Sequence, residues 1–214
     1  MPRELPRLIV ITDWEIPRHQ LFERLEAAMS AGPAVAVQHR HPGAPIRTFL
    51  EEAQALAELC RIGGNPLFIN GRLDVALLVE ANLHLPADGI LPGDVRPHLP
   101  AKAWVSIAVH DPPEAKAASG ADIALVSPVF SPGSKPADRR TPLGPDGFRQ
   151  LALVTPCAAF ALGGVTPSNA AQITSAAGLA VISAVLRSED PGRTARELLD
   201  RCSNLASGPA QRGP

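Results

Sequence analysis

Polar side chains that could bind an anion or move a proton follow several short apolar runs of this sequence. Gln38 and Arg40 follow one run, Asn70 ends another, and His110 follows a third. An arginine fork can hold a carboxylate or a phosphate, and an amide can meet a ring nitrogen, although Asn70 could also cap a helix. Histidine titrates near neutral pH, so His110 is a candidate acid/base group. Together these residue types indicate a site for a small anionic ligand.

Three other segments are candidates for holding a phosphate group. Their residues are Gly163, Gly164, Ile182, Ser183, Ser134 and Lys135. The glycine pair directly follows an apolar run, and paired glycines let backbone N–H groups approach an anion. The serine and lysine at 134–135 belong to a long polar loop that could close over a phosphate as a lid. The alternatives are an ordinary tight turn and a solvated loop with a surface lysine.

We expect no metal held by protein groups alone. His39 and His41 form a His-x-His pair, but no third ligand with matching spacing accompanies them. By strand parity and position, we expect His39 and His84 to reach the ligand less well than His110. The cysteines are odd in number and far apart, which is typical of buried thiols in a cytosolic protein: Cys60, Cys157 and Cys202.

Charge and composition narrow the class of protein. The chain has 214 residues, with 20 Lys plus Arg against 21 Asp plus Glu and a formal net charge of −1. This balance gives no electrostatic reason for a nucleic-acid or membrane-surface partner. No apolar run approaches the roughly 20 residues that cross a bilayer, and the N-terminus lacks the pattern of a signal peptide. We therefore expect a cytoplasmic globular protein that binds a small molecule.

The apolar runs that carry the candidate residues have the length of β-strands. They are continuous rather than alternating, as expected of strands covered on both faces. Eight are present: Leu8–Thr12, Ala34–Gln38, Pro66–Asn70, Leu83–Leu85, Ala103–Val109, Ile123–Val126, Ala158–Leu162 and Ala180–Ser183. Segments with helical spacing or helix-start signals alternate with them: Arg18–Ser30, Arg47–Ile62, Leu73–Glu80, Gly93–His98, Pro113–Ser119, Gly144–Leu153, Pro167–Ala176 and Thr194–Leu205.

Eight strands, each followed by a helix or a helical turn, predict a compact α/β fold, the (β/α)₈ TIM barrel, as a single domain over residues 1–205. A doubly wound parallel sheet is the alternative, but it rarely needs eight regular repeats. Residues 206–214 are small and polar, and we expect them to form a disordered tail. In such a barrel the site lies at the carboxyl ends of the strands, and the loops after the seventh and eighth strands are the usual phosphate site.

The strand ends, taken in order, resemble the thiamine phosphate synthase/TenI superfamily. The matching stretches are Leu8–Asp13, Val37–Arg40, Phe68–Ala76, His84–Arg96, Val105–Lys116, Gly120–Lys135, Ala161–Asn169 and Gly178–Leu186. The resemblance implies a phosphate-binding barrel of thiamin biosynthesis. Synthases of this superfamily join hydroxymethylpyrimidine diphosphate to a thiazole phosphate using Mg²⁺. TenI-like members instead tautomerise a thiazole phosphate carboxylate and need no metal.

The sequence departs from the synthase pattern where that pattern binds Mg²⁺ and diphosphate. Gly71 and Gly89 stand where the two metal-binding aspartates are expected, and Asp88 is only adjacent to the second position. Ala108 replaces a serine that the pattern places on the pyrophosphate. In the lid, the pattern Thr-x-Thr-Lys becomes Pro-Gly-Ser-Lys at residues 132–135. The loss of both carboxylates removes a means of activating a diphosphate leaving group.

These departures favour a metal-independent, TenI-like thiazole tautomerase. Asn-Gly-Arg at residues 70–72 and Leu-Pro at 85–86 fit that branch, in which the histidine matching His110 is the acid/base group and no cofactor is required. The first alternative is a thiamine phosphate synthase with a shifted Mg²⁺ site on Asp88, with Asp74 as a second ligand. The second is a non-catalytic phosphate-ligand binder or regulator. In each case we expect a homo-oligomer that binds a thiazole phosphate.

Overall fold

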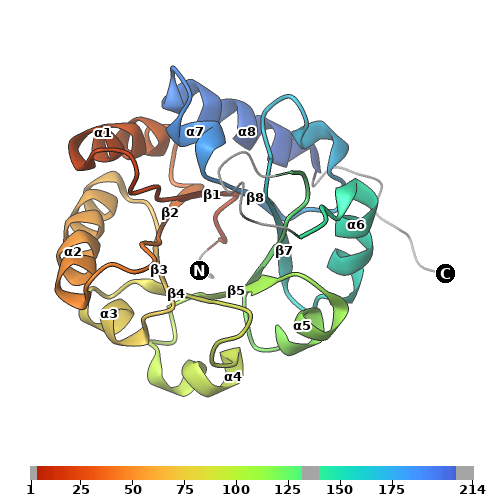
Figure 1. The fold of residues 1–214 in the computed structure, drawn as a ribbon, viewed down its shortest axis with the longest axis horizontal. Coiled ribbons are helices and arrows are strands. Elements are labelled where there is room, and N and C mark those ends of the chain that lie inside the picture. The colour runs from red at the N-terminus through yellow and green to blue at the C-terminus, as the bar shows by residue number, and fades with distance from the viewer. Residues whose placement is uncertain (1–3, 132–139, 206–214) are drawn as a thin grey trace.

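The computed structural model describes residues 4–131 and 140–205. Within them, eight parallel strands close into a barrel, which confirms the predicted single-domain (β/α)₈ fold (Figure 1). The strands are β1 (Leu8–Ile11), β2 (Val35–His39), β3 (Leu67–Asn70), β4 (Asn82–Leu85), β5 (Val105–Val109), β6 (Ile123–Val126), β7 (Ala158–Leu162) and β8 (Gly178–Val181). The barrel closes because Leu8 pairs with Val35 on one side and with Leu179 on the other.

The helices surround this barrel (Figure 1). They are α1 (Arg18–Met29), α2 (Ile46–Gly63), α3 (Leu73–Leu78), α4 (Pro92–Val95), α5 (Pro112–Ala117), α6 (Gly144–Val154), α7 (Ser183–Leu186) and α8 (Pro191–Leu205), with 3₁₀ turns η1 (Arg96–His98) and η2 (Ala170–Gln172). No helix among the described residues is long and apolar enough to cross a membrane. Residues 206–214, expected to form a tail, lie outside the described part of the chain.

Helix α2 illustrates how local sequence forms these elements. Phe49, Ala53, Leu56 and Cys60 recur every three or four residues and are buried, so one stripe of the helix packs inward. Gly64 ends the helix with φ of 70°, a left-handed conformation that glycine adopts without strain. The predicted end of this helix is therefore confirmed.

Strand parity decides which side chains enter the barrel. Side chains alternate across a strand, so Ile9 and Ile11 point inward while Leu8 and Val10 pack against the helices. The inner cluster is built from few aromatic and many aliphatic residues: Ile9, Ile11, Ala36, Phe68, Trp104, Ile123, Leu125, Phe160 and Ala180. The next inward position along each strand lies one layer higher, at the mouth of the barrel.

The segment between β7 and β8 differs from the prediction. A helix was expected over Pro167–Ala176, but only the 3₁₀ turn η2 forms there. Asn169 explains the difference, since its side chain accepts a hydrogen bond from Thr166 N at 2.8 Å and donates one to Gly164 O at 2.8 Å. Such side-chain bonds compete with helical ones. Gly178, two residues past the expected end of that helix, begins β8, where a Cβ would lie 2.5 Å from the ring of Phe160.

Candidate active site

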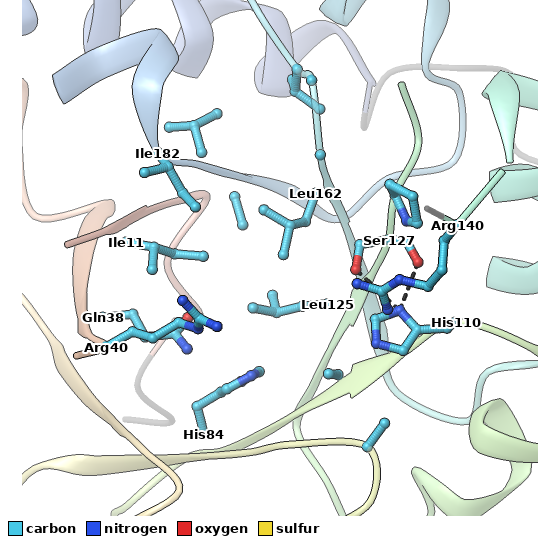
Figure 2. Close-up of a pocket in the computed structure, with 18 of the residues that line it drawn as sticks. Ile11, Gln38, Arg40, His84, His110, Leu125, Ser127, Arg140, Leu162 and Ile182 are labelled. Carbon is cyan, nitrogen blue, oxygen red and sulfur yellow. Dashed lines mark hydrogen bonds between the residues drawn. The ribbon is translucent and has the colours of Figure 1, made fainter. Parts of the chain in front are cut away.

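A cavity of about 670 Å³ opens at the carboxyl ends of the strands, where the barrel fold predicts a site (Figure 2). All the candidate residues that fall within the described part of the chain line it: Gln38, Arg40, Asn70, His110, Gly163, Gly164, Ile182 and Ser183. Ser134 and Lys135, expected to form a lid, lie outside the described residues.

Two amides, Gln38 and Asn70, form one wall of the cavity. Gln38 is buried, and its Nε2 donates to Asn70 Oδ1 at 3.4 Å. The other amide atom of Gln38, Oε1, is buried without a hydrogen-bond partner among the described residues. The pair therefore offers a ligand one acceptor, on Gln38, and one donor, on the Asn70 amide nitrogen. A buried acceptor without a partner is costly, so a ligand donor at this position is favoured.

Arg40 reaches into the same cavity beside Gln38 (Figure 2). Thr12 fixes the backbone of Arg40, because its Oγ1 accepts from Arg40 N at 2.9 Å and donates to Arg40 O at 3.1 Å. The guanidinium is half-buried, and burial lowers its pKa. Within the described residues it has no ion-pair or hydrogen-bond partner. A half-buried cation without a counter-ion favours an anionic ligand.

His84 also lines the cavity but is buried, whereas His110 is partly exposed there. It pairs in register with Asn70, so both side chains point inward. Its Nδ1 lies 2.8 Å from Ser106 Oγ. Burial, followed by the charges of Arg40 and His110, lowers the pKa of His84 to about 3, so the ring is neutral. His39 packs outside the barrel, as its parity predicts.

His110 is held by the end of β6. Its Nδ1 lies 2.7 Å from the carbonyl oxygen of Ser127 and 3.2 Å from the Ser127 hydroxyl (Figure 2). A carbonyl can only accept, so Nδ1 carries a proton and donates it, which leaves Nε2 as the variable ring nitrogen. The backbone N–H of His110 donates to Glu114 Oε2 at 2.6 Å. The ring is therefore fixed in orientation.

The two glycines after β7 have a packing reason for their identity. Gly163 and Gly164 have φ of 96° and 63°, and a Cβ on Gly164 would lie 2.6 Å from the carbonyl oxygen of Ser131. The start of the loop after β6 thus packs closely against them. Across the same cavity wall, Ser183 begins the short helix α7, which the sequence did not predict. Loops after strands 7 and 8 with a short extra helix form the common phosphate site of this fold.

Sequence reasoning missed Arg140 and Ser127, both of which line the cavity. Figure 2 shows the Arg140 side chain beside His110 and Ser127. Ser127 follows Leu125 by two residues, so strand parity could have found it. Arg140 lies in an aperiodic polar segment, and no pattern in the sequence distinguishes it from an ordinary surface arginine.

A second histidine cluster lies outside the barrel wall. The buried carboxylate of Glu52 on α2 is 2.9 Å from His41 Nδ1 and 3.6 Å from His39 Nε2. Trp14 stacks on His41, with ring centroids 5.2 Å apart. No group of three His, Cys, Asp or Glu side chains within residues 4–131 and 140–205 has the arrangement of a metal site. This cluster therefore links β2, α2 and the loop after β1 as a packing and hydrogen-bonding unit.

Comparisons with known proteins bear on the chemistry of this cavity. A family model described as thiamine monophosphate synthase matches residues 8–185. The thiamine-phosphate synthase of Chloroflexus aurantiacus is 36% identical over 197 residues, which cover 90% of each chain. That of Clostridium perfringens is 32% identical over 203 residues, 92% of this chain and 97% of the relative. The solved structure of thiamine phosphate pyrophosphorylase from Pyrococcus furiosus matches with a TM-score of 0.79 and 28% identity over 93% of this chain and 96% of that one.

These similarities contradict the tautomerase interpretation of the sequence. Relatives that span nearly the whole chain are named thiamine-phosphate synthases, so the isomerase assignment is wrong and the first alternative is better supported. The glycines that favoured the tautomerase have a local structural reason. Gly71 has φ of 70°, and a Cβ on Gly89 would lie 2.9 Å from Pro86 Cγ. These two glycines therefore do not by themselves indicate a different reaction.

Proposed function

Because the chain belongs to the thiamine monophosphate synthase family, we propose that it is a thiamine-phosphate synthase that joins hydroxymethylpyrimidine diphosphate to a thiazole phosphate. The methylene C–O bond breaks, and its electron pair leaves with the diphosphate. The thiazole ring nitrogen supplies the pair for the new C–N bond. No proton changes place in this exchange, so the chain has to bind and orient two rings and stabilise the charge of the leaving group.

The observation that carries the proposal is the amide pair of Gln38 and Asn70. An aminopyrimidine presents an N–H donor beside a ring-nitrogen acceptor. Gln38 Oε1, which is buried without a partner among the described residues, can accept from the amino group, while the Asn70 amide donates to the ring nitrogen. A thiazole has no N–H group, so this pair has no evident use if the thiazole phosphate is the sole ligand.

The two phosphorylated ends of the substrates have separate places in this proposal. The thiazole phosphate binds at Gly163, Gly164, Ile182 and Ser183, the common phosphate position of the barrel. The diphosphate lies toward Arg40 and the fixed ring of His110. His110 then acts as a contact to an anion rather than as an acid/base group, because the coupling transfers no proton.

Synthases of this family are expected to use Mg²⁺, and the residues present do not fit a metal held by two carboxylates. The expected positions are Gly71 and Gly89. Asp74, the second candidate for a shifted site, is bound by Arg72 through contacts of 3.0 and 2.6 Å and does not line the cavity. Asp88 does line it, but it is exposed at the rim. Of these positions in the described part of the chain, Asp88 alone would offer Mg²⁺ a carboxylate at the cavity.

An assay with both substrates tests the function, and Gln38→Met tests the pyrimidine site. Methionine keeps the volume of Gln38 but removes the acceptor, so kcat/KM for the pyrimidine substrate should fall about 10- to 100-fold. The matched control is Gln54→Met, which changes an exposed glutamine of α2. If Gln38→Met retains the wild-type kcat/KM, the amide pair does not recognise the pyrimidine.

A further inference from the structure

The turns after β3 and β4 carry glycines where carboxylates would anchor a cation, and the second turn leaves no room for a side chain. Gly71, at the first expected carboxylate position, has a left-handed backbone with φ of 70° and carries no side chain that could bind a cation. A Cβ on Gly89 would lie 2.9 Å from Pro86 Cγ and 3.1 Å from the carbonyl oxygen of Pro86. The Pro86 ring is rigid, and Gly89 N donates to Pro86 O at 3.1 Å. The tight turn from Pro86 to Gly89 therefore excludes a side chain at position 89.

The other carboxylates near the mouth do not replace them. Glu114 lines the cavity, but its Oε2 accepts the backbone N–H of His110 at 2.6 Å. Asp74 is held by Arg72 in two contacts. Among the carboxylates that line the described cavity, Asp88 at the exposed rim and the second oxygen of Glu114 remain. Neither replaces a pair of carboxylates that would hold Mg²⁺ from the two turns.

Two arginine side chains, Arg40 and Arg140, line the cavity. Arg40 enters the cavity from the end of β2, and Arg140 enters from the segment that leads to α6 (Figure 2). Arg40 is held by Thr12 at both backbone polar groups and has no counter-ion among the described residues. Arg40, His84 and His110 line the same cavity, so the Arg40 cation and the fixed His110 ring face one site.

We propose that this chain stabilises its departing diphosphate by direct contact with the guanidinium groups of Arg40 and Arg140, without requiring a carboxylate-held Mg²⁺. The inference rests on the proposed synthase function. As the C–O bond breaks, its electron pair adds negative charge to the diphosphate oxygens. A planar guanidinium donates two parallel N–H bonds to such oxygens and keeps its proton when partly buried. Cations fixed in advance at the developing charge stabilise the transition state more than the ground state.

The first experiment measures thiamine phosphate formation by protein stripped of metal, in EDTA and in a Mg²⁺ titration. We expect turnover in EDTA within about tenfold of the rate with Mg²⁺, a difference of about 1.4 kcal/mol in the barrier. Turnover that occurs only with added Mg²⁺ overturns the inference and leaves the synthase function intact. Absence of turnover in both conditions overturns the synthase function itself.

The second experiment uses inorganic pyrophosphate as the probe and does not depend on turnover. Calorimetry in EDTA should detect binding to the wild-type protein. Arg140→Gln should weaken it about 10- to 100-fold, since charged hydrogen bonds are lost. Arg40→Lys, which keeps the charge but loses the fork, should weaken it less than Arg40→Gln.

The control for this binding experiment is Arg149→Gln on α6. Arg149 lies outside the cavity lining and pairs with exposed Asp146, so its replacement should leave pyrophosphate affinity unchanged. Thermal unfolding of each variant confirms that it is folded. Binding that needs Mg²⁺, or an Arg140→Gln variant with wild-type affinity in EDTA, contradicts the direct contact.

Discussion

Two buried histidines, His84 at the mouth of the barrel and His39 outside it, make the stability of the protein depend on pH. Burial lowers the pKa of His84 to about 3 and that of His39 to about 4. The unfolded chain binds a proton at each of them near pH 6.5, whereas the folded chain does not. The unfolded state therefore gains protons first as the pH falls. Acidification from about pH 6.5 toward 4 favours unfolding.

We predict that the free energy of unfolding falls across this range by up to about 2.7 kcal/mol per pH unit, the slope for two protons. Urea unfolding at several pH values measures it. His84→Gln should remove about half of the slope, whereas His19→Gln, at an exposed histidine of α1, should leave it unchanged. A stability that stays level or rises on acidification through this window would show that these rings are protonated in the folded protein.

At the scale of single residues, strand parity predicted the cavity well. Gln38, Arg40, Asn70 and His110 line it because each continues the inward alternation of its strand. Parity says nothing about residues in long loops, which is why Arg140 was missed. A comparison of motifs also takes no account of the backbone geometry of turns. The glycines at 71 and 89 therefore favoured the tautomerase, which was the wrong reaction.

The loops at the carboxyl ends of β6 and β7 form one packed element. A Cβ on Gly163 would lie 2.9 Å from Pro128, and its φ is 96°. Gly163→Ala should therefore cost about 1–3 kcal/mol of unfolding free energy, from strain and close contact together. Gly43→Ala is the matched control, since Gly43 has φ of 80° and open space around its Cα. Equal losses in the two variants would show that the contact with Pro128 contributes nothing.

The link between α2 and the end of β2 depends on a buried carboxylate. Glu52 contacts His41 at 2.9 Å and is nearly inaccessible to solvent. Glu52→Gln keeps the shape but removes the charge, and we expect it to lower the free energy of unfolding by about 1–3 kcal/mol at neutral pH. Glu51→Gln, at the exposed neighbouring position, should change it by no more than about 0.5 kcal/mol. Denaturant titration of both variants decides whether the Glu52 charge stabilises this link.

Elements with strong periodicity were predictable, and elements set by tertiary contacts were not. The apolar stripe predicted α2, and the apolar runs predicted all eight strands to within a few residues. The expected helix at 167–176 failed because the Asn169 side chain bonds to the backbone on either side of Val165. Helix α7 has four residues, too few to show a hydrophobic period.

At the scale of the whole molecule, the barrel alone does not specify the reaction, because the same fold supports many chemistries through its loops. The possible reactions are narrowed by an amide pair, two arginines and the loops after β7 and β8 around one cavity, together with relatives named as synthases. The order of strands and the position of the site followed from the sequence. The choice between synthase and tautomerase required the comparisons.

The most direct measurement follows both products at once. The purified protein is incubated with hydroxymethylpyrimidine diphosphate and thiazole phosphate, and thiamine phosphate and diphosphate are quantified together over time. A synthase forms them in equal amounts at a rate proportional to the protein concentration, and Gln38→Met slows both to the same extent. If the folded protein forms no thiamine phosphate, with or without Mg²⁺, or releases diphosphate without it, the synthase assignment is contradicted.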